Sequence, residues 1–359
     1  MKKFVVIDGN AILHRAWHAL PPSLTTQDGT IVNAVYGFAS ILLKVLQELK
    51  PDYVAVAWDT AAKTFREERY ADYKATRETK EQELYNQIPI IQDMMEHFHF
   101  PNLLLDGYEA DDVIGTLACK AKKTDGVETI IVTGDMDTLQ LIDDRTRVYG
   151  LRKGISDTVL YDADAVRARY GLGPEQMIDF KALKGDPSDN IKGVKGIGEK
   201  TAQTLIAKFV TLEKMYEAIE GQEKVEGIKP GQLKKLQDGK ADALLSKELV
   251  TIHCEVPVKF KLEDAAFSQY RAEDVFPIFQ KLGFKSLISR LPKPSKMQGV
   301  LLAVAAAPAA LYTHVTTKDA CEKLAKSLAK QKRFAFDTET TGVSVFEDTI
   351  LGLSVSFEE

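Results

Sequence analysis

The chain has 359 residues, 45% hydrophobic and 28% charged, with a formal net charge of −5. This length predicts at least two domains of an ordinary soluble protein, and the weak negative charge neither indicates nor excludes nucleic-acid binding. We exclude a membrane span because no apolar run is long enough, and a signal peptide because the start Met1-Lys2-Lys3 does not have its pattern. We exclude a cysteine metal site because the three cysteines are far apart, and we expect a cytoplasmic protein.

The first half of the chain alternates short apolar runs with helical patterns. Strands are predicted at 3–7, 53–58, 103–105 and 128–132, and helices from about residue 11 and over 33–49. This alternation predicts an α/β domain with a mostly parallel central sheet flanked by helices. In the first helix His14 and His18 share a face and could form half a zinc site, but no third ligand lies at a suitable spacing, so we do not expect one.

Acidic residues follow the predicted strands. Asp8, Asp59, Asp135 and Asp137 each come just after a strand. Any of them could be a turn residue, since Asp is common in turns. The carboxyl ends of parallel strands meet at one edge of a sheet, where ligands bind, so we expect these acids to lie together.

Three more acids crowd into the stretch 107–115. Glu109, Asp111 and Asp112 precede an apolar helical run at 113–121. One interpretation is an acidic helix cap, because the helix dipole tolerates negative charge there. The other is a metal site, because three adjacent carboxylates repel one another unless a cation neutralises them.

The segment 63–83 has few aliphatic residues. On a helix, Arg66, Tyr70, Tyr73 or Lys74, Arg77 and Lys80 would form one basic and aromatic stripe. Such a stripe suits single-stranded nucleic acid, through phosphate contacts and base stacking. The alternative is a solvated helix with many ion pairs, because acids nearly balance the bases.

After Tyr149 the pattern becomes helical. A helix predicted at 174–183 leads to an acidic loop with Asp186 and Asp189, and then to a glycine-rich turn that opens the next helix. The turn contains Gly193, Lys195, Gly196, Gly198 and Lys200. Free backbone N–H groups and nearby lysines suit an anion, whereas the alternative is an ordinary turn between two helices.

The rest of the chain is predicted to contain a lysine-rich segment at 221–239 with a turn at 229–231, helices at 241–251 and 272–282, and a linker at 292–310. A second unit at 311–359 has a helix at 318–330, a strand at 333–336 followed by Asp337 and Glu339, and a strand at 350–356. This is too little to close a domain, so we expect that the sequence is a fragment.

The chemistry of the first unit follows from its acids. Nine carboxylates are gathered: Asp8, Asp59, Glu109, Asp111, Asp112, Asp135, Asp137, Asp186 and Asp189. A cluster without His or Cys suits hard ions such as Mg²⁺ or Mn²⁺. Two such ions can hydrolyse a phosphodiester with a metal-bound water, and the sequence has no nucleophile triad or Gly-x-x-x-x-Gly-Lys loop.

The assembled motifs resemble the 5′ nuclease (flap endonuclease) family, in the form found in the N-terminal part of bacterial DNA polymerase I enzymes. The matching pieces occur in family order over about residues 1–290: Phe4 to Asn10, Ala57-Trp58-Asp59, Phe65-Arg66 with Tyr73 to Arg77, Gly107 to Asp112, Thr133 to Asp137, and Leu183 to Ala202. The resemblance implies a PIN-like 5′ nuclease core at 1–170 with a helical arch at 60–85. It also implies a helix-hairpin-helix region for duplex DNA at 171–291, often with a bound K⁺.

The resemblance also implies residue roles. Asp8, Asp59, Glu109, Asp111 and Asp112 would hold the tighter metal ion, and Asp135, Asp137, Asp186 and Asp189 the second. Arg66, Lys74 and Arg77 would be arch residues, with Lys74 and Arg77 at the scissile phosphate. Residues 311–359 resemble the start of a 3′–5′ proofreading domain, in which Asp337 and Glu339 would be an incomplete metal pair.

The expected function is therefore a metal-dependent nuclease acting on DNA with a 5′ flap, a nick or an RNA primer. The resemblance implies a monomeric protein associated with the bacterial nucleoid, with a polymerase domain beyond residue 359. Two alternatives stay open: a non-catalytic DNA-binding module whose acids bind a structural ion, and a PIN-like ribonuclease. Such ribonucleases usually lack the arch stripe and the hairpin.

Overall fold

The computed structural model describes residues 1–76, 82–154, 156–292, 315–340 and 349–356. The chain divides into two units, Met1–Pro294 and Ser295–Glu359. The expected linker at 292–310 lies almost wholly outside the described residues, as do Arg77 and Lys80. Within the described part of the chain, no helix has the length and apolarity that a membrane crossing needs.

A mixed sheet organises the first unit. Its six strands run in the order β3-β2-β1-β4-β5-β6, and all neighbours are parallel except β5 and β6. The strands are β1 (Lys2–Asp8), β2 (Tyr53–Ala57), β3 (Asn102–Leu103), β4 (Val127–Thr133), β5 (Thr146–Lys153) and β6 (Asp157–Tyr161). Central strands β1 and β4 are apolar and buried because helices cover both faces.

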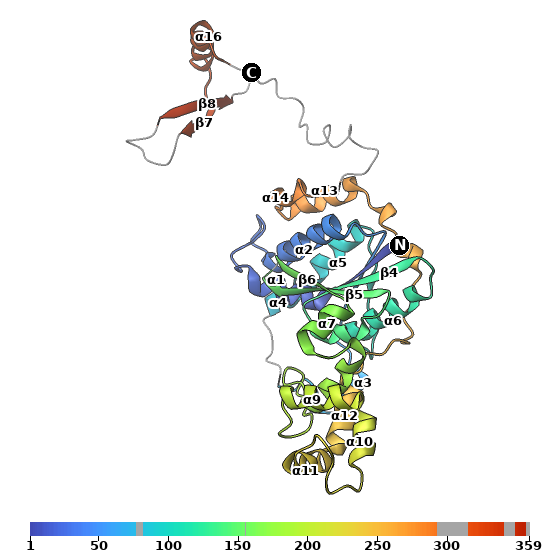
Figure 1. Ribbon diagram of the computed structural model, residues 1–359. Helices are drawn as coiled ribbons and strands as arrows, with labels where there is room; N and C mark the ends of the chain where they lie inside the picture. The colour runs from blue at the N-terminus through green and yellow to red at the C-terminus, as the bar shows by residue number, and fades with distance from the viewer. Residues whose placement is uncertain (77–81, 155, 293–314, 341–348, 357–359) are drawn as a thin grey trace. The chain divides into compact units, whose positions relative to one another are not determined.

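Helices pack on the two faces of this sheet (Figure 1). Helices α1 (Gly9–Ala19), α2 (Asn33–Leu49) and α5 (Ile88–His97) lie on one face, and α6 (Ala110–Lys122) and α7 (Ala163–Tyr170) lie on the other. The mostly parallel α/β architecture predicted from the alternation is thus confirmed. The prediction that the chain turns helical after Tyr149 is wrong, because β5 and β6 continue the sheet to Tyr161 as an antiparallel hairpin.

The segment expected to form a helical arch is not one helix. It contains α3 (Phe65–Arg69), a series of turns to residue 76, and α4 (Gln82–Tyr85), with 77–81 outside the described residues. Lys74 has a φ of 56°, which no helix accommodates. The predicted i,i+3/i+4 stripe is therefore wrong for the described residues, because the chain turns at 70–76 to meet other parts of the fold.

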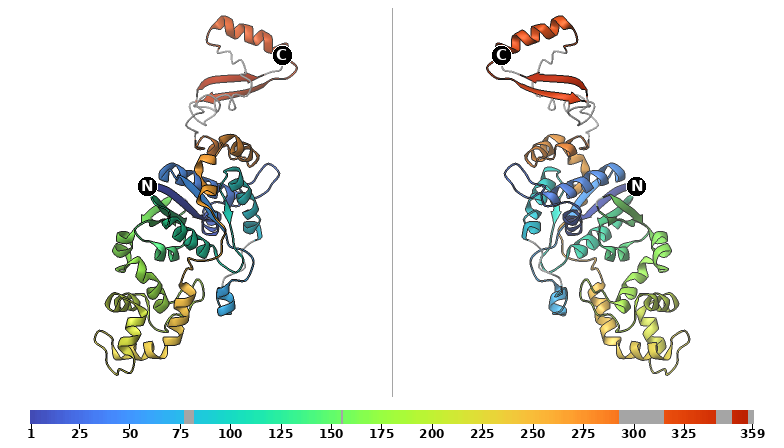
Figure 2. Two further views of the ribbon diagram at one scale, coloured as in Figure 1. Left: turned by 90° about the vertical axis from the view of Figure 1, so that its right-hand side faces the viewer. Right: turned by 90° about the vertical axis from the view of Figure 1, so that its left-hand side faces the viewer.

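A helical region follows the sheet (Figure 2). It comprises η2 (Pro174–Gln176), α8 (Met177–Lys184), α9 (Glu199–Phe209), α10 (Leu212–Ile219), α11 (Pro230–Asp238) and α12 (Lys240–Val250). The short helix η1 (Met136–Leu141) lies earlier in the chain, between β4 and β5, and contacts η2 and α8. Helix α12 packs on α8, so the region folds back towards the sheet. The turn predicted at 229–231 is wrong, because Pro230 is the first residue of α11, where its missing N–H has no cost.

Residues 252–291 return to the sheet instead of continuing the helical region. The backbone N–H of Phe267 donates to the carbonyl of Asp52 at 2.8 Å, and Ala266 bridges to Tyr53. The following elements are η3 (Leu262–Ala265), η4 (Phe267–Gln269), α13 (Ala272–Lys281) and α14 (Lys285–Ile288), and α13 packs against α5. The predicted single region at 171–291 therefore spans two different parts of the fold, because the apolar face of α13 has its partner on the sheet side.

The second unit contains α16 (Lys318–Leu328) and an antiparallel pair, β7 (Ala335–Thr340) and β8 (Ile350–Ser356). The predicted strand at 333–336 is displaced towards the C-terminus. Asp337 and Glu339 consequently lie within β7, not after it, and pair with Ser354 and Gly352.

Candidate active site

The carboxyl ends of β1 and β4 lie side by side, where the strand order changes direction. Asp8 is the last residue of β1, and only 4% of its surface is exposed. Its Oδ1 accepts a hydrogen bond from the backbone N–H of Ala11 at 2.9 Å, which caps α1. The hydroxyl of Thr133, at the end of β4, donates to Oδ2 of Asp8 at 2.7 Å. The crevice thus holds one carboxylate in a fixed orientation.

Other carboxylates surround Asp8 closely enough to change its titration. Burial, reinforced by the charges of Asp59 and Asp135, raises the pKa of Asp8 to about 7. Burial and the charges of Asp135 and Asp8 raise the pKa of Asp111 well above its usual value. Burial and Asp135 raise the pKa of Asp137 to about 7 as well. Acids from β1, α6 and the loop after β4 therefore form one electrostatic cluster.

Asp59 joins the loop after β2 to α6. Its Oδ1 accepts from the backbone N–H of Ala110 at 2.7 Å, and its Oδ2 accepts from the Asn10 side chain at 2.8 Å. Asn10 was not predicted as a site residue, although it lies two residues after Asp8. Its amide neutralises no charge, but it fixes the orientation of a carboxylate on the cluster.

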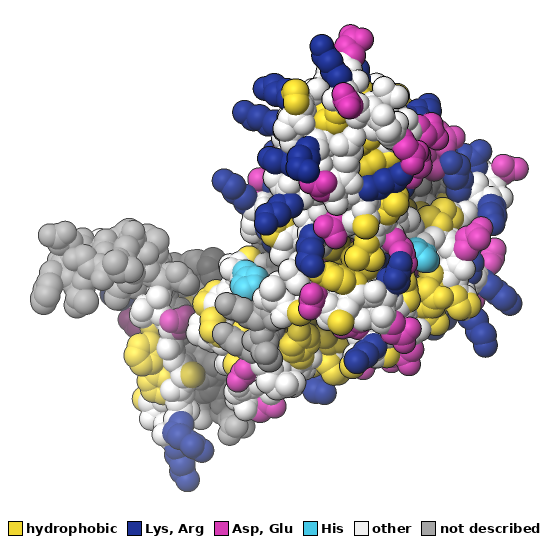
Figure 3. Space-filling view, turned by 90° about the horizontal axis from the view of Figure 1, so that it is seen from below, with side chains coloured by type: hydrophobic (Ala, Val, Ile, Leu, Met, Phe, Trp, Pro, Cys, Tyr) yellow, Lys and Arg dark blue, Asp and Glu magenta, His cyan; other side chains and the backbone are white. Residues whose placement is uncertain are grey.

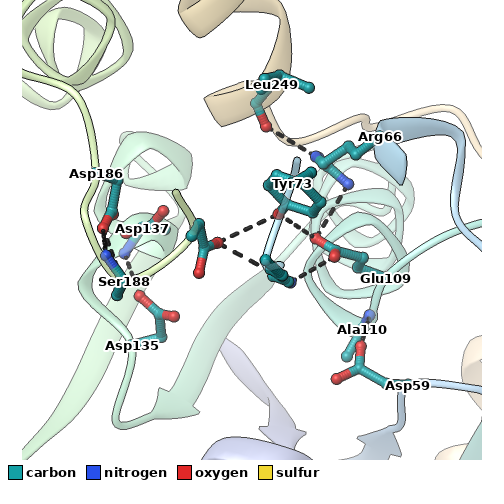
Figure 4. A network of polar contacts seen from close by, with 12 residues as sticks. Asp59, Arg66, Tyr73, Glu109, Ala110, Asp135, Asp137, Asp186, Ser188 and Leu249 are labelled. Atoms are coloured by element: carbon teal, nitrogen blue, oxygen red, sulfur yellow. Dashed lines mark hydrogen bonds and ion pairs between the residues drawn. The ribbon is translucent and has the colours of Figure 1, made fainter. Parts of the chain in front are cut away.

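A lysine and a tyrosine lie against the outer acids on the α6 side (Figure 4). Lys74 Nζ contacts a carboxylate oxygen of Glu109, and lies 3.9 Å from Oδ2 of Asp189. The hydroxyl of Tyr73 donates to Glu109 at 3.1 Å and to Asp189 at 3.2 Å. The segment 70–76, α6 and the acidic loop before the hairpin therefore meet at these two carboxylates.

A second lysine, missed by the sequence reasoning, lies among the acids on the β4 side. Lys181 Nζ contacts Asp137 and lies 2.8 Å from Oδ2 of Asp186. Burial lowers the pKa of Lys181, but Asp137 and Asp186 outweigh it, so the pKa is raised. Burial raises the pKa of Asp186, but Lys181 and Ser188 lower it to about 2. The only signal in the sequence was a lysine in the last turn of a helix that leads into an acidic loop.

Asp112 has a different environment from the other acids. It is fully buried, and Arg66, itself 2% exposed, binds it with two N–H···O contacts of 2.6 and 2.9 Å. Backbone N–H groups of Glu109 and His253 also donate to its two oxygens. The remaining Arg66 donors bind the carbonyls of Leu249 and Thr251. Both oxygens thus have partners within the protein, as do those of Asp8 and Asp59, and the role of Asp112 as a metal ligand stays a prediction.

The predicted DNA contacts of the segment 63–76 differ in burial. Arg66 and Tyr73 are buried, and Tyr70 is half-buried with Lys192 Nζ 5.6 Å from its ring centre. These side chains attach the segment 63–76 to the body of the protein, and their contact with DNA stays a prediction. Lys74 keeps 23% of its side chain exposed, and Arg77 lies outside the described residues.

The donor set fits a hard divalent cation, because the cluster offers only carboxylate oxygens and its members raise one another's pKa. In the described ranges of the chain, however, no three Asp, Glu, His or Cys side chains are arranged to coordinate one ion as they stand. Lys74 and Lys181 neutralise the outer acids instead. The cluster therefore has the charge and chemistry of a metal site, and its side chains would have to move to bind a metal.

The glycine-rich turn lies between α8 and α9, as predicted from the sequence. Gly193 has a φ of 60°, and a Cβ there would lie 2.3 Å from the backbone nitrogen of Gly185, so the two loops touch through glycine alone. Its N–H is used internally, donating to Ser246 Oγ at 3.1 Å. The exposed members of the turn are Lys195, Gly196, Gly198 and Lys200. Gly198 is the N-cap of α9, so the unpaired N–H groups of that helix face solvent near two lysines.

In the second unit, Asp337 is exposed, and the side chain of Glu339 lies outside what is described. His14 and His18 line a hollow beside Asp135, not a group of metal ligands.

Comparison with protein families gives two consecutive matches. Residues 3–171 match the N-terminal resolvase-like domain of 5′-3′ exonucleases, and residues 172–273 match their C-terminal SAM-fold domain. The boundary falls directly before η2, where the helical region begins.

Among curated proteins, DNA polymerase I of Caldicellulosiruptor bescii is 44% identical over 291 residues, covering 80% of this chain and 33% of the relative. DNA polymerase I of Bacillus subtilis is 43% identical, covering 82% and 33%. That of Bacillus caldotenax is 38% identical over 348 residues, covering 97% and 38%. The chain thus spans about a third of the length of these relatives.

Solved structures share the fold. The T5 D15 protein co-crystallised with metal ions has a TM-score of 0.57 at 18% identity, covering 79% of this chain and 99% of that one. The bacteriophage T5 D15 flap endonuclease in a pseudo-enzyme–product complex with DNA and metal ions has a TM-score of 0.56, also at 18% identity, covering 79% of this chain and all of that one. The solved structures show the fold, and the two consecutive domain matches over residues 3–273 show that the chain belongs to the 5′–3′ exonuclease family, to which its DNA polymerase I relatives are similar.

Proposed function

We propose that this chain is a metal-dependent nuclease that hydrolyses DNA at 5′ flaps, nicks and RNA primers, as the N-terminal part of a DNA polymerase I. The single observation that carries the proposal is the electrostatic cluster of Asp8, Asp111, Asp135 and Asp137 at the carboxyl edge of the sheet. Buried carboxylates that oppose one another's ionisation are unfavourable for folding. Such groups are found mainly at functional sites, so this cluster indicates one.

Two divalent ions, Mg²⁺ or Mn²⁺, would supply a water of lowered pKa and a counter-charge for the departing oxygen. The residues proposed to hold them are Asp8, Asp59, Glu109, Asp111, Asp135, Asp137, Asp186 and Asp189. Asp112 would join this set if an ion displaced Arg66, which neutralises it in the structure. A polyanionic substrate cannot approach this many carboxylates without cations, so activity should require a divalent metal.

Lys74 is proposed to act at the substrate. Its ammonium lies on Glu109 and near Asp189, and an incoming ion would compete for both carboxylates. Once displaced, the ammonium would stay next to the cluster, because the backbone N–H of Lys74 is held by the carbonyl of Asp189 at 2.9 Å. A lysine held there can pair with a phosphate oxygen and stabilise its negative charge. Arg77 is proposed as its companion on the strength of the motif alone.

The hairpin between α8 and α9 is proposed to grip duplex DNA through Lys195, Lys200 and the N-terminus of α9. A potassium ion at this turn, as the resemblance implies, would require backbone carbonyls. The carbonyl of Gly196 already accepts from Lys235 at 3.3 Å, so Lys235 would have to give way.

The test is cleavage of a labelled 5′-flap duplex by the chain, compared with a nicked duplex and an RNA-primed duplex. We expect cuts with Mg²⁺, none with a chelator, and a loss of at least a hundredfold for Asp135→Asn, since electrostatic groups at a reaction centre contribute about 10²–10³ in rate. Cleavage that persists in chelator would eliminate the two-metal chemistry. Binding without cleavage under all conditions would favour a DNA-binding module, and preference for single-stranded RNA would favour a PIN-like ribonuclease.

A further inference from the structure

Two hollows lie next to the acid cluster, and apart from Asp135 none of their lining residues has a part in the chemistry above. The first, of about 370 Å³, is lined by Ala11, His14, Arg15, His18, Gly134 and Asp135. The second, of about 430 Å³, is lined by Arg15, Gly134, Met136, Leu151, Arg152, Lys153, Asp157 and Arg169. Both share Arg15 and Gly134, so they form one continuous groove between α1 and the β5–β6 hairpin. We refer to it as the Arg15 groove.

The charge of the Arg15 groove is opposite to that of the chain. The protein has a net charge of −5, yet the groove carries four Arg and Lys side chains against two acids, Asp135 at its mouth and Asp157. Arg152 pairs with Asp157 at 3.0 Å, so the other three cations have no acid partner among the groove's own lining residues. A positive groove that opens on the acid cluster would attract an anion which continues past the reacting bond.

Two of the cations are held in place, as expected for a built site. The Arg15 guanidinium donates to the backbone carbonyls of Leu151 and Arg152 at 3.1 and 3.0 Å, which fixes it across the groove. Arg169 lies 5.0 Å from the ring centre of Tyr170 and contacts the Tyr161 hydroxyl. Guanidinium groups whose side chains are already ordered lose less entropy when they bind a phosphate.

Gly134 lines both hollows of the Arg15 groove. A Cβ on Gly134 would lie 3.4 Å from Arg15 Nη2, so a side chain there would cover the guanidinium. Each hollow has the volume of a small-ligand pocket, which suits one or two nucleotides of a single strand. A duplex is far too wide to enter it.

From these observations we propose that the Arg15 groove binds the sugar–phosphate backbone of a single nucleic-acid strand that continues from the acid cluster, with Arg15, Arg152, Lys153 and Arg169 as phosphate contacts. This rests on the proposed function for its substrate class, but binding can be measured without cleavage. The contacts are with phosphates, so the groove should not discriminate between base sequences.

The test uses the whole chain in EDTA, with fluorescence anisotropy of a labelled 12-residue oligothymidylate and of a blunt duplex over a range of salt concentrations. Arg152→Gln with Lys153→Gln removes two exposed cations and keeps the backbone carbonyl that holds Arg15. We expect several-fold weaker single-strand binding and a salt slope reduced by roughly 1.4, since each phosphate contact on a single strand contributes about 0.7. Duplex binding should change little.

The matched control is Lys122→Gln with Lys123→Gln, which removes two exposed charges where α6 ends and before β4 begins, at the opposite edge of the sheet. It should leave the single-strand salt slope unchanged. The proposal is overturned if the groove variant has the slope of the wild type, if the control loses as much, or if only duplex binding weakens. Flap cleavage by the wild type is measured separately. If the wild type cleaves and the groove variant binds single strands with an unchanged salt slope, the groove proposal alone is rejected. If the wild type does not cleave, the proposed function is rejected.

Discussion

Replacing Asp8 by Asn should stabilise the protein when no metal is present. The pKa of Asp8 is about 7 in the fold against 3.8 for a free carboxyl. Each unit of pKa corresponds to about 1.4 kcal/mol, so above pH 7 the ionised form of Asp8 lowers the unfolding free energy by up to about 4 kcal/mol. Asn keeps the cap on α1 but loses the acceptor for Thr133. The pKa of about 7 already includes the bond from Thr133 to the charged carboxylate, so only a neutral hydrogen bond of about 1 kcal/mol remains to be subtracted. The net expectation is a gain of about 3 kcal/mol in unfolding free energy at pH 8.

The gain should depend on pH in one direction. Because the folded carboxyl has the higher pKa, the folded state binds the proton more tightly than the unfolded state. The contribution of Asp8 to stability is therefore greatest at low pH and is lost as the pH rises from about 4 to about 7. At pH 5.5 the cost is only about 2 kcal/mol, and the lost neutral hydrogen bond offsets about 1 kcal/mol of it, so the gain of the variant should fall to about 1 kcal/mol there.

Urea unfolding in EDTA at pH 5.5 and pH 8 measures both expectations. Asp125→Asn, which neutralises an exposed acid at the opposite edge of the sheet, is the control and should change stability by less than about 0.5 kcal/mol at either pH. A loss of stability for Asp8→Asn at pH 8, or an equal gain at both pH values, would refute the idea that the cluster is under electrostatic strain. In saturating Mg²⁺ the order should reverse, because the wild type gains binding energy that the variant lacks.

Three further outcomes follow from the packing of the site. Arg66→Met leaves Asp112 buried without a counter-charge and should cost about 3–5 kcal/mol in urea unfolding, whereas a loss below about 1 kcal/mol would show that the pair is not buried in solution. Gly193→Ala should lower the melting temperature by several degrees, because its φ of 60° and a 2.3 Å contact exclude a Cβ; an unchanged melting curve would contradict the close loop contact. Lys195→Glu with Lys200→Glu should weaken duplex binding and flatten its salt dependence by roughly 2, and an unchanged slope would remove the hairpin from the DNA contact.

Local pattern was enough to identify the elements that position the site. Helix 33–49 and strand 350–356 have the predicted bounds, and β1, β2 and β4 differ from prediction by one or two residues. The apolar runs of β1, β2 and β4 are buried on both faces, so the signal does not depend on neighbours. The hairpin of β5 and β6 was missed because its strands mix polar and apolar residues, and only pairing along the edge of the sheet makes them strands.

Sequence alone determined the acid cluster in its outline, because parallel strands bring their carboxyl ends to one edge wherever each strand starts. Only the tertiary structure decided which acids belong to the cluster. Glu109, Asp111 and Asp112 are near neighbours in the chain, but the helix turns them in different directions, so that Asp112 meets Arg66 and the other two face the cluster and Lys74. The same is true of the cations: Lys181 and the Arg15 groove arise from contacts between elements far apart in sequence, which no local spacing records.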